Sequence, residues 1–301
     1  MFRRDTGMKK YNSNSLFPKF CFGCESLGGA DWGVVDIKHL MLVVSESVAL
    51  GVNFFDVADC YGLGLAETRL SKALGPNRHN VLIATKGGVR WEKQSGRAKT
   101  WIDVTPSYIK HAFFASLKRL HLEQIPVYFL HYPGNDSDFK ASLELLASLK
   151  EKQLIRFVGV SNVGHKELEI ALKILTLDII QIPVNILNRP LDKKIQKLCS
   201  TNGIRVVSYN SLASGLLSGK YNQDSVFALN DRRSRRQDFS KDSLKKQLIE
   251  INNLKQTAKL EELSLAQYAI KELHNRYIEL SSTIIGIKSR EQLIHNLHAY
   301  A

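Results

Sequence analysis

The sequence has few cysteines and no long hydrophobic run, and both scarcities narrow the class of protein. Its 301 residues include only four cysteines, too few for a disulfide framework in a chain of this length. The longest apolar runs, such as residues 40–44, are far shorter than the ~20 residues that cross a bilayer. The basic N-terminus is not followed by the apolar core of a secretory signal. We therefore expect a cytoplasmic protein with no membrane partner.

Pairs of residues at the spacing of metal ligands are also scarce. Cys21 and Cys24 have the CxxC spacing of redox and zinc sites. A zinc site would need a second such pair, or two histidines at ligand spacing, and the sequence has neither. Small structural residues at the end of a strand are the better interpretation of Cys21 and Cys24, so the sequence predicts no metal site.

The charges are not balanced, because 42 Lys and Arg residues stand against 29 Asp and Glu residues, for a formal net charge of +13. A basic balance favours anionic partners such as a phosphorylated ligand or nucleic acid, although a solvated basic surface is equally compatible. The densest basic run is Arg232–Arg236. No aromatic residues interleave with it, so we expect no nucleic-acid partner. A solvated loop, or a contact near phosphates or an anionic substrate, remains open for this run.

What the sequence does contain is a regular alternation of short apolar runs and helical patterns. Eight runs are typical of buried strands, at residues 19–23, 53–56, 81–85, 126–130, 155–160, 178–183, 204–208 and 282–286. Eight parallel βα units predict an α/β fold, a (β/α)8 TIM barrel in a single domain. The domain would span residues 18–301 after a flexible lead-in at residues 1–17. A long loop would follow the seventh strand.

Polar residues stand at the ends of consecutive predicted strands, where the active site of such a barrel lies. Asp56 ends the second strand, Lys86 follows the third, His131 follows the fourth, and Tyr61 lies in the loop after the second. Each alone could be a cap, a surface charge, a packed ring or a loop aromatic. Four such residues at successive strand ends favour a catalytic site.

These four residue types suit proton transfer to a carbonyl oxygen. A nearby Lys86 ammonium would lower the pKa of Tyr61 from its free value of ~10. Asp56 would hold Lys86 by a salt bridge, and His131 would hydrogen-bond the substrate oxygen or help to pass the proton. The site has no hydride donor of its own, which implies a nicotinamide cofactor. The glycine fingerprint of a Rossmann fold is absent, so the cofactor must be held in another way.

From about residue 20 to residue 297 the sequence resembles the aldo-keto reductase family. The most specific segment is Gly51–Glu67, which contains Asp56 and Tyr61; residues 83–86 and 128–131 match the lysine and histidine segments. The resemblance implies a catalytic tetrad of Asp56, Tyr61, Lys86 and His131, with Tyr61 as general acid or base. It also implies an oxidoreductase that reduces an aldehyde, ketone or sugar carbonyl to an alcohol, or catalyses the reverse reaction.

The resemblance further implies a cofactor site for NADPH, with NADH possible. Ser161, Asn162 and Gln181 would hold the nicotinamide amide, and Tyr209 would stack on its ring. The segment 212–220 would cover the pyrophosphate. Lys288 would lie near the ribose 2′-phosphate, which favours NADPH. The full expected set is Gly23, Ser161, Asn162, Gln181, Tyr209, Asn210, Leu212, Gly215, Leu217, Lys220, Gly286, Lys288, Gln292 and Asn296.

Several alternatives stay open. A chain of this fold could instead be a cofactor-binding accessory or regulatory subunit. A long loop is expected at residues 87–105, with Trp91 and Trp101. This loop, Trp32 and the loop after strand seven could line the substrate site or be ordinary packing. No long C-terminal tail is expected to close the pocket, so the site should be open. The sequence does not specify the small carbonyl or alcohol substrate, the reaction direction or the oligomeric state.

Overall fold

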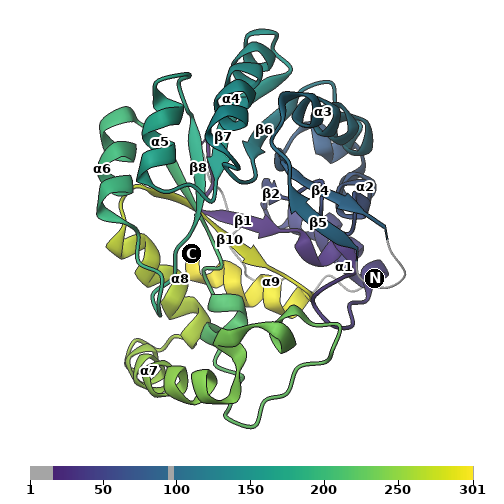
Figure 1. The fold of residues 1–301 in the computed structure, drawn as a ribbon. Helices are drawn as coiled ribbons and strands as arrows, with labels where there is room; N and C mark the ends of the chain where they lie inside the picture. The colour runs from purple at the N-terminus through teal and green to yellow at the C-terminus, as the bar shows by residue number, and fades with distance from the viewer. Residues whose placement is uncertain (1–15, 94–97, 301) are drawn as a thin grey trace.

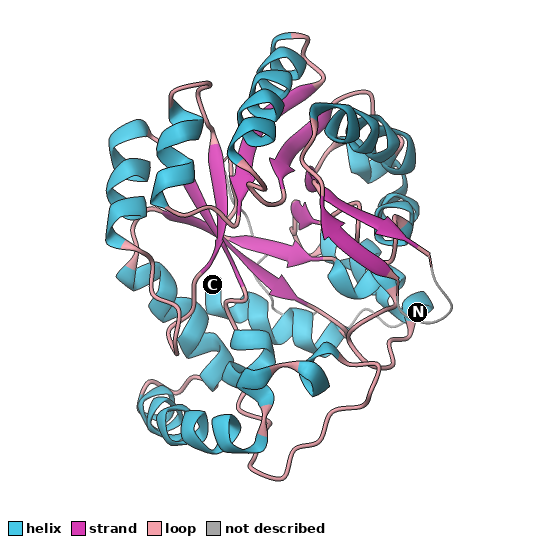
Figure 2. Cartoon of the chain, in the orientation of Figure 1, coloured by secondary structure: helices cyan, strands magenta, loops and turns pink. Residues whose placement is uncertain are grey.

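The computed structural model describes residues 16–93 and 98–300, in which eight parallel strands close into a barrel (Figures 1 and 2). Their order around the barrel is β1-β10-β9-β8-β7-β6-β3-β2. The strands are β1 (Phe20–Gly23), β2 (Phe54–Asp56), β3 (Leu82–Gly87), β6 (Ile125–Leu130), β7 (Ile155–Ser161), β8 (Ile179–Pro183), β9 (Arg205–Tyr209) and β10 (Leu280–Gly286). The prediction of a single-domain (β/α)8 barrel is confirmed.

Helices pack around the outside of the barrel (Figure 2). They are α1 (Ile37–Ala49), α2 (Leu65–Leu74), α3 (Pro106–Leu120), α4 (Asp136–Glu151), α5 (His165–Leu172), α6 (Lys193–Asn202), α7 (Lys241–Leu260), α8 (Leu265–Arg276) and α9 (Arg290–Leu297). The start of α3 shows how the sequence sets a boundary. Thr105 caps the helix by accepting a hydrogen bond from the Tyr108 N–H at 3.4 Å, and Pro106 is its first residue. None of the described helices has the length and apolar character of a membrane span.

Aromatic side chains close the barrel where its strands begin. Phe17 is only 2% exposed, and its ring centroid lies 5.9 Å from that of Phe54 and 5.0 Å from that of Phe157. The guanidinium of Arg205 lies 5.1 Å from the Phe17 ring centroid. With this end filled, the active site is expected at the opposite end, where the strands end, which we call the barrel mouth. Of the expected lead-in, residues 1–15 lie outside the described residues, whereas Phe17 belongs to the core.

One prediction about the chain is wrong. The sequence predicts a long loop at residues 87–105, but this segment contains two strands, β4 (Val89–Glu92) and β5 (Lys99–Ile102), paired antiparallel. The hairpin lies beside α3 (Figure 1). Its side chains are exposed or half-buried, so no apolar run marks either strand in the sequence.

The predicted long loop after the seventh barrel strand connects β9 to α7 and contains three short 3-10 helices, η3 (Ala213–Ser218), η4 (Arg232–Arg235) and η5 (Gln237–Phe239). Part of it reaches the loop after β1, since Arg232 N–H donates to the Asp31 carbonyl at 2.9 Å and Trp32 forms a backbone bridge with Asp231. Figure 1 shows this green segment meeting the purple β1–α1 connection. We call residues 231–239 the arginine strap.

Candidate active site

The four predicted catalytic residues come together at the barrel mouth. Asp56 is the last residue of β2, Lys86 lies near the end of β3, and His131 directly follows β6. Because β2, β3 and β6 are neighbours in the barrel, their carboxyl ends lie side by side. Tyr61, in the loop after β2, packs against this group, with its ring centroid 5.2 Å from the Lys86 Nζ.

The Lys86 ammonium is buried and held by three hydrogen bonds. Its side chain is 1% exposed, and its Nζ donates to the two carboxylate oxygens of Asp56 at 2.8 and 2.9 Å and to the carbonyl of Val57 at 2.8 Å. Gln181 Nε2 also donates to Asp56 Oδ2, at 2.7 Å. Extra hydrogen bonds of this kind are what a buried ion pair needs to offset the loss of hydration. These hydrogen bonds therefore fix the positions of the Lys86 and Asp56 side chains next to Tyr61.

The pKa of Tyr61 moves in the direction opposite to the sequence-based expectation. Burial, with further contributions from Glu25 and Asp56, raises the pKa of Tyr61 well above its ordinary value of 10, while Arg232 opposes the shift. The Lys86 Nζ lies 5.2 Å from the Tyr61 ring centroid, yet burial of the phenol dominates the shift. Tyr61 therefore keeps its proton at neutral pH, which is the state required of a proton donor.

His131 is neutral. Burial and the charge of Lys86 lower the pKa of His131 well below 6.5. Its backbone is held on both sides, with the N–H donating to the Gly87 carbonyl and the C=O accepting from Asn162 Nδ2, each at 2.9 Å. The His131 ring stacks on Tyr132 at a centroid distance of 5.0 Å. A neutral imidazole can donate one N–H to a substrate oxygen, which favours the hydrogen-bonding role over the proton-carrying one.

The residues expected at the nicotinamide form a second hydrogen-bonded group, across the ends of β7, β8 and β9. Asn162 Nδ2 donates to Ser161 Oγ at 3.1 Å, and Ser161 Oγ donates to the Gln181 carbonyl at 3.0 Å. Tyr209 Oη donates to Asn162 Oδ1 at 2.5 Å. Through the side-chain amide of Gln181, this group is joined directly to Asp56.

The segment after β9 carries several residues in the left-handed backbone region. Asn210, Ala213, Ser214 and Gly215 have φ values of 54°, 49°, 53° and 97°. Backbone N–H groups in such turns can converge on an anion, as the expected pyrophosphate contact requires. The side chain of Leu217 is fully buried in the core with α7 and α8, and its N–H donates to the Leu212 carbonyl at 3.2 Å, so the structure does not support the expected contact of Leu217 with the cofactor. The expected site residues Leu212 and Lys220 flank this turn.

Positive charge gathers around Lys288, where the 2′-phosphate is expected. Lys288 Nζ donates to the Trp32 carbonyl at 2.5 Å and lies 5.6 Å from the centroid of its ring. Burial, and the charges of Arg233 and Lys220, lower the pKa of Lys288. Several cations in one place fit a phosphate group. The expected adenosine contacts Gln292 and Asn296 lie on α9, and Gln292 Oε1 accepts from the Lys288 N–H at 2.9 Å.

Gly23 and Gly286 pair across β1 and β10, between these two ends of the expected cofactor site. A Cβ at Gly23 would lie 3.0 Å from Ile284 Cγ2, whereas a Cβ at Gly286 would meet nothing within 4 Å. Packing therefore does not explain the glycine at position 286. A glycine at the end of a strand is typical of a place where another chain or a ligand approaches closely. The residues present fit a nicotinamide dinucleotide.

Some residues near the site carry no individual signal in the sequence. Arg232 Nη2 donates to Glu25 Oε1, and both charges act on Tyr61. Glu25 stands 207 positions before Arg232, so only the fold brings the two together. In the sequence, the basic run Arg232–Arg236 indicates contacts with anionic groups, but it does not identify Glu25 as one of them.

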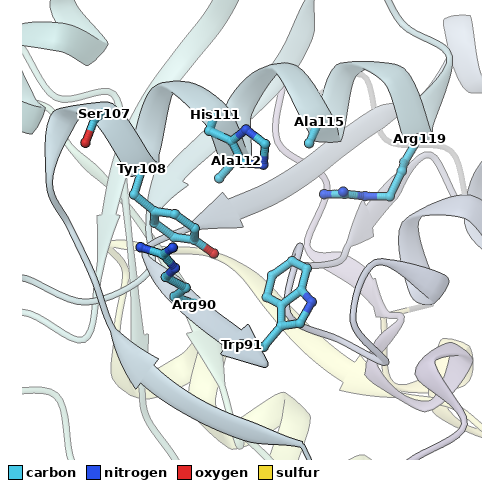
Figure 3. Close-up of a pocket in the computed structure, with 8 residues that line it drawn as sticks. All are labelled: Arg90, Trp91, Ser107, Tyr108, His111, Ala112, Ala115 and Arg119. Atoms are coloured by element: carbon cyan, nitrogen blue, oxygen red, sulfur yellow. The ribbon is translucent and has the colours of Figure 1, made fainter. Parts of the chain in front are cut away.

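A separate cavity of about 460 Å³ lies between the hairpin and α3 (Figure 3). Figure 3 shows Trp91 among its lining residues, pointing toward α3, while the other residues come from β4 and α3. None of the tetrad residues lines it. Trp91 is therefore placed against α3, and this cavity is not the candidate active site.

Residues 19–301 match the family model described as the Aldo/keto reductase family. The chain belongs to this family. Aldo/keto reductases use nicotinamide cofactors, so the chain is an NAD(P)(H)-dependent oxidoreductase. The fold and the tetrad at the barrel mouth are consistent with this assignment.

Three aldo/keto reductases illustrate the similarity. "Aldo-keto reductase YhdN" of Bacillus subtilis is 28% identical over 79% of this chain and 71% of its own length. The "NADH-specific methylglyoxal reductase" of Escherichia coli is 31% identical over 66% of this chain and 64% of its own length. Among solved structures, the glycerol dehydrogenase AKR11B4 from Gluconobacter oxydans has a TM-score of 0.85 and 25% identity, with 98% of this chain and 90% of that chain covered.

Proposed function

We propose that this protein is an NADPH-dependent reductase that converts a small aldehyde or ketone to an alcohol, with Tyr61 as the proton donor. The observation that carries the proposal is the buried Lys86–Asp56–Gln181 network behind a tyrosine that keeps its proton. When bound, the cofactor supplies a hydride to the carbonyl carbon. Tyr61 gives its proton to the carbonyl oxygen as negative charge develops there.

The other members of the tetrad support Tyr61. His131, being neutral, donates a hydrogen bond to the same oxygen and so orients the carbonyl. Lys86 lies close to the Tyr61 ring and stabilises negative charge on the phenol oxygen once the proton has left. Asp56 holds the Lys86 ammonium in place. In the reverse direction the same groups would take a proton from an alcohol.

The preference for NADPH rests on the positive charges around Lys288. Lys288, Arg233 and Lys220 lie near one another where a 2′-phosphate is expected, and that phosphate is absent from NADH. The name of the Escherichia coli relative specifies NADH, so the preference of this chain has to be measured. The names of the relatives, a methylglyoxal reductase and a glycerol dehydrogenase, favour small polar carbonyls as the first compounds to assay.

The decisive experiment compares Tyr61→Phe with the natural enzyme on a panel of small aldehydes and ketones. We expect kcat to fall by about 10²- to 10⁴-fold, the usual contribution of a positioned general acid. The dissociation constant of NADPH, followed by the change in its fluorescence, should stay within a few-fold. A variant that retains most of its turnover would refute the role of Tyr61. Tight NADPH binding by the natural protein without turnover of any carbonyl would favour an accessory cofactor-binding subunit instead.

A further inference from the structure

Three side chains with metal-binding atoms meet at the edge of the tetrad. Of the three, only His131 has a role in the proposed proton transfer. Asp59 and Cys60 lie in the loop after β2, and His131 follows β6. One ligand atom from each, a carboxylate oxygen, a sulfur and a ring nitrogen, lies within 4.8 Å of the other two. Cys60 and His131 are 71 positions apart, which is why ligand spacing in the sequence does not predict this cluster.

Asp59 is the most unusual member of the cluster. Its side chain is completely buried, and within the described residues neither carboxylate oxygen has a hydrogen-bond partner. The cations that act on it are engaged elsewhere, because Lys86 binds Asp56 and Arg119 binds Glu67 at 2.6 Å. Burial, and the charge of Glu67, raise the pKa of Asp59 well above 3.8, so the carboxyl is protonated when no cation is bound. A buried polar group whose oxygens both lack a partner still calls for an explanation, such as a place for an ion.

The distances suit a small cation. Cys60 Sγ lies 3.8 Å from His131 Nδ1. Two ligands that bind one tetrahedral Zn²⁺, with Zn–S ~2.3 Å and Zn–N ~2.1 Å, are about 3.6 Å apart. The sulfur and nitrogen are thus already near the separation that zinc requires. The carboxylate oxygen of Asp59 lies within 4.8 Å of both, so a small side-chain movement would complete a three-ligand site.

The chemistry of the ligands selects the ion. Sulfur and imidazole ligands favour Zn²⁺ over Mg²⁺ and Ca²⁺, which prefer oxygen. Cys60 is half-buried, whereas Asp59 and His131 are buried, so an ion would enter past the Cys60 side chain. Three protein ligands leave the fourth position of a tetrahedral ion to water.

We propose that Asp59, Cys60 and His131 form a Zn²⁺ site that switches off the reductase. Binding converts the Cys60 thiol to a thiolate and the buried Asp59 carboxyl to a carboxylate, and both protons are released to solvent. His131 Nδ1 becomes a ligand, and the movement that brings the three ligand atoms together takes the ring out of the position from which it orients the substrate carbonyl. The inhibition rests on the proposed reductase function, whereas metal binding does not.

Binding is tested without turnover by adding Co²⁺, a spectroscopic substitute for Zn²⁺, to the natural protein. We expect a sulfur-to-cobalt charge-transfer band that is lost on addition of Zn²⁺. The band should be absent from Cys60→Ala and weakened or shifted in Asp59→Asn. Cys199→Ala is the matched control, since Cys199 is a fully buried cysteine on α6, and it should keep the band. Far-ultraviolet circular dichroism confirms that each variant is folded.

Inhibition is tested by titrating Zn²⁺ during NADPH oxidation, with each variant compared with its own metal-free rate. The half-inhibiting concentration should rise at least about tenfold in Cys60→Ala and in Asp59→Asn, and EDTA should restore activity. Mg²⁺ and Ca²⁺ should have no effect. A natural protein without the cobalt band, or equal inhibition of natural and Cys60→Ala enzymes, would overturn the proposal. If the protein showed the cobalt band but reduced no carbonyl, the metal site would be supported and the proposed reductase function would be refuted.

Discussion

Two networks of charged side chains border the predicted cofactor site, and they are built in opposite ways. The network at the barrel mouth joins Lys86, Asp56 and Gln181 on three strands, and the side chains of its ion pair are 1% and 6% exposed. The arginine strap lies on loops, and most of its charged side chains are between a quarter and two fifths exposed. Its ion pairs are Arg232–Glu25, Arg233–Asp231, Arg235–Asp31 and Arg236–Asp238.

The difference shows which network can move. Loss of one partner at the mouth would leave a charge buried without compensation, a loss that is strongly destabilising. Each exposed strap pair exchanges with water and contributes at most about 1 kcal/mol. Two of these pairs connect the strap to the loop after β1, so detaching the strap would break these weak ion pairs together with the Arg232–Asp31 backbone hydrogen bond and the Trp32–Asp231 bridge. We therefore expect a rigid mouth beneath a strap that opens when the cofactor enters or leaves.

The largest contrast should come from removing one carboxylate in each network. Asp56→Asn leaves the Lys86 ammonium buried without an opposite charge, and we expect the free energy of unfolding to fall by about 3–5 kcal/mol. Asp238→Asn, in a strap pair with side chains 30% and 35% exposed, should cost less than about 1 kcal/mol. Urea denaturation measures both. If both variants lost the same free energy of unfolding, the buried and the exposed network would contribute equally to stability.

Lys288, which contacts Trp32 and feels the charge of the strap residue Arg233, should decide cofactor preference. Lys288→Met is expected to raise the dissociation constant of NADPH by about 10- to 100-fold, the usual effect of losing a hydrogen bond to a charged group. The dissociation constant of NADH should hardly change. Lys271→Met, which removes an exposed ion pair with Glu261, is the control for a lost surface charge. Equal weakening of both cofactors, measured by calorimetry, would argue against a 2′-phosphate contact.

Salt should distinguish the strap from the mouth. Raising sodium chloride from about 0.05 to about 0.5 M screens half-exposed pairs but hardly affects a buried one. The rate of NADPH release, measured by stopped-flow fluorescence, should therefore rise about two- to fivefold. Arg232→Gln, which removes the pair with Glu25, should release NADPH faster at low salt and respond less to added salt. If the rate of NADPH release responded to salt in Arg232→Gln as it does in the natural protein, the strap would have no part in cofactor release.

The smallest expected effect concerns pH, because the two tetrad groups that contact the substrate oxygen both have pKa values far from neutrality. His131 has its pKa well below 6.5 and Tyr61 has its pKa well above 10. The kcat of carbonyl reduction at saturating substrate should then be constant from about pH 7 to about pH 9. On the acid side it should change only when His131 gains a proton, and on the alkaline side only when Tyr61 loses one. A limb centred near pH 6.5 would show that His131 acts as an imidazolium.

The fold was predictable because most residues of each barrel strand are buried, so that each strand forms a mainly apolar run. The same pattern placed Asp56, Lys86 and His131 at strand ends, and the structure brings these residues together. The ends of the eight barrel strands differ from the predicted apolar runs by at most two residues. The hairpin was missed because its strands bury no continuous face.

Features that depend on distant contacts were not predictable. The pKa of Tyr61 is set by burial and by Glu25 as well as by its neighbour Asp56, and the sequence does not show how deeply a side chain is buried. The cluster of Asp59 with His131 likewise joins two separate strand ends. Neither feature has a local pattern of residue types from which it could be inferred.

Phe17 has a consequence for where the folding unit begins. The family match starts at residue 19, yet the side chain that plugs the barrel interior stands two positions earlier. A chain shortened to the matched segment would keep every strand and the whole tetrad but would lose this plug. Water would then reach the rings of Phe54 and Phe157 from below the barrel. The smallest autonomous unit of this protein is thus defined by packing, and it is longer than the segment defined by similarity.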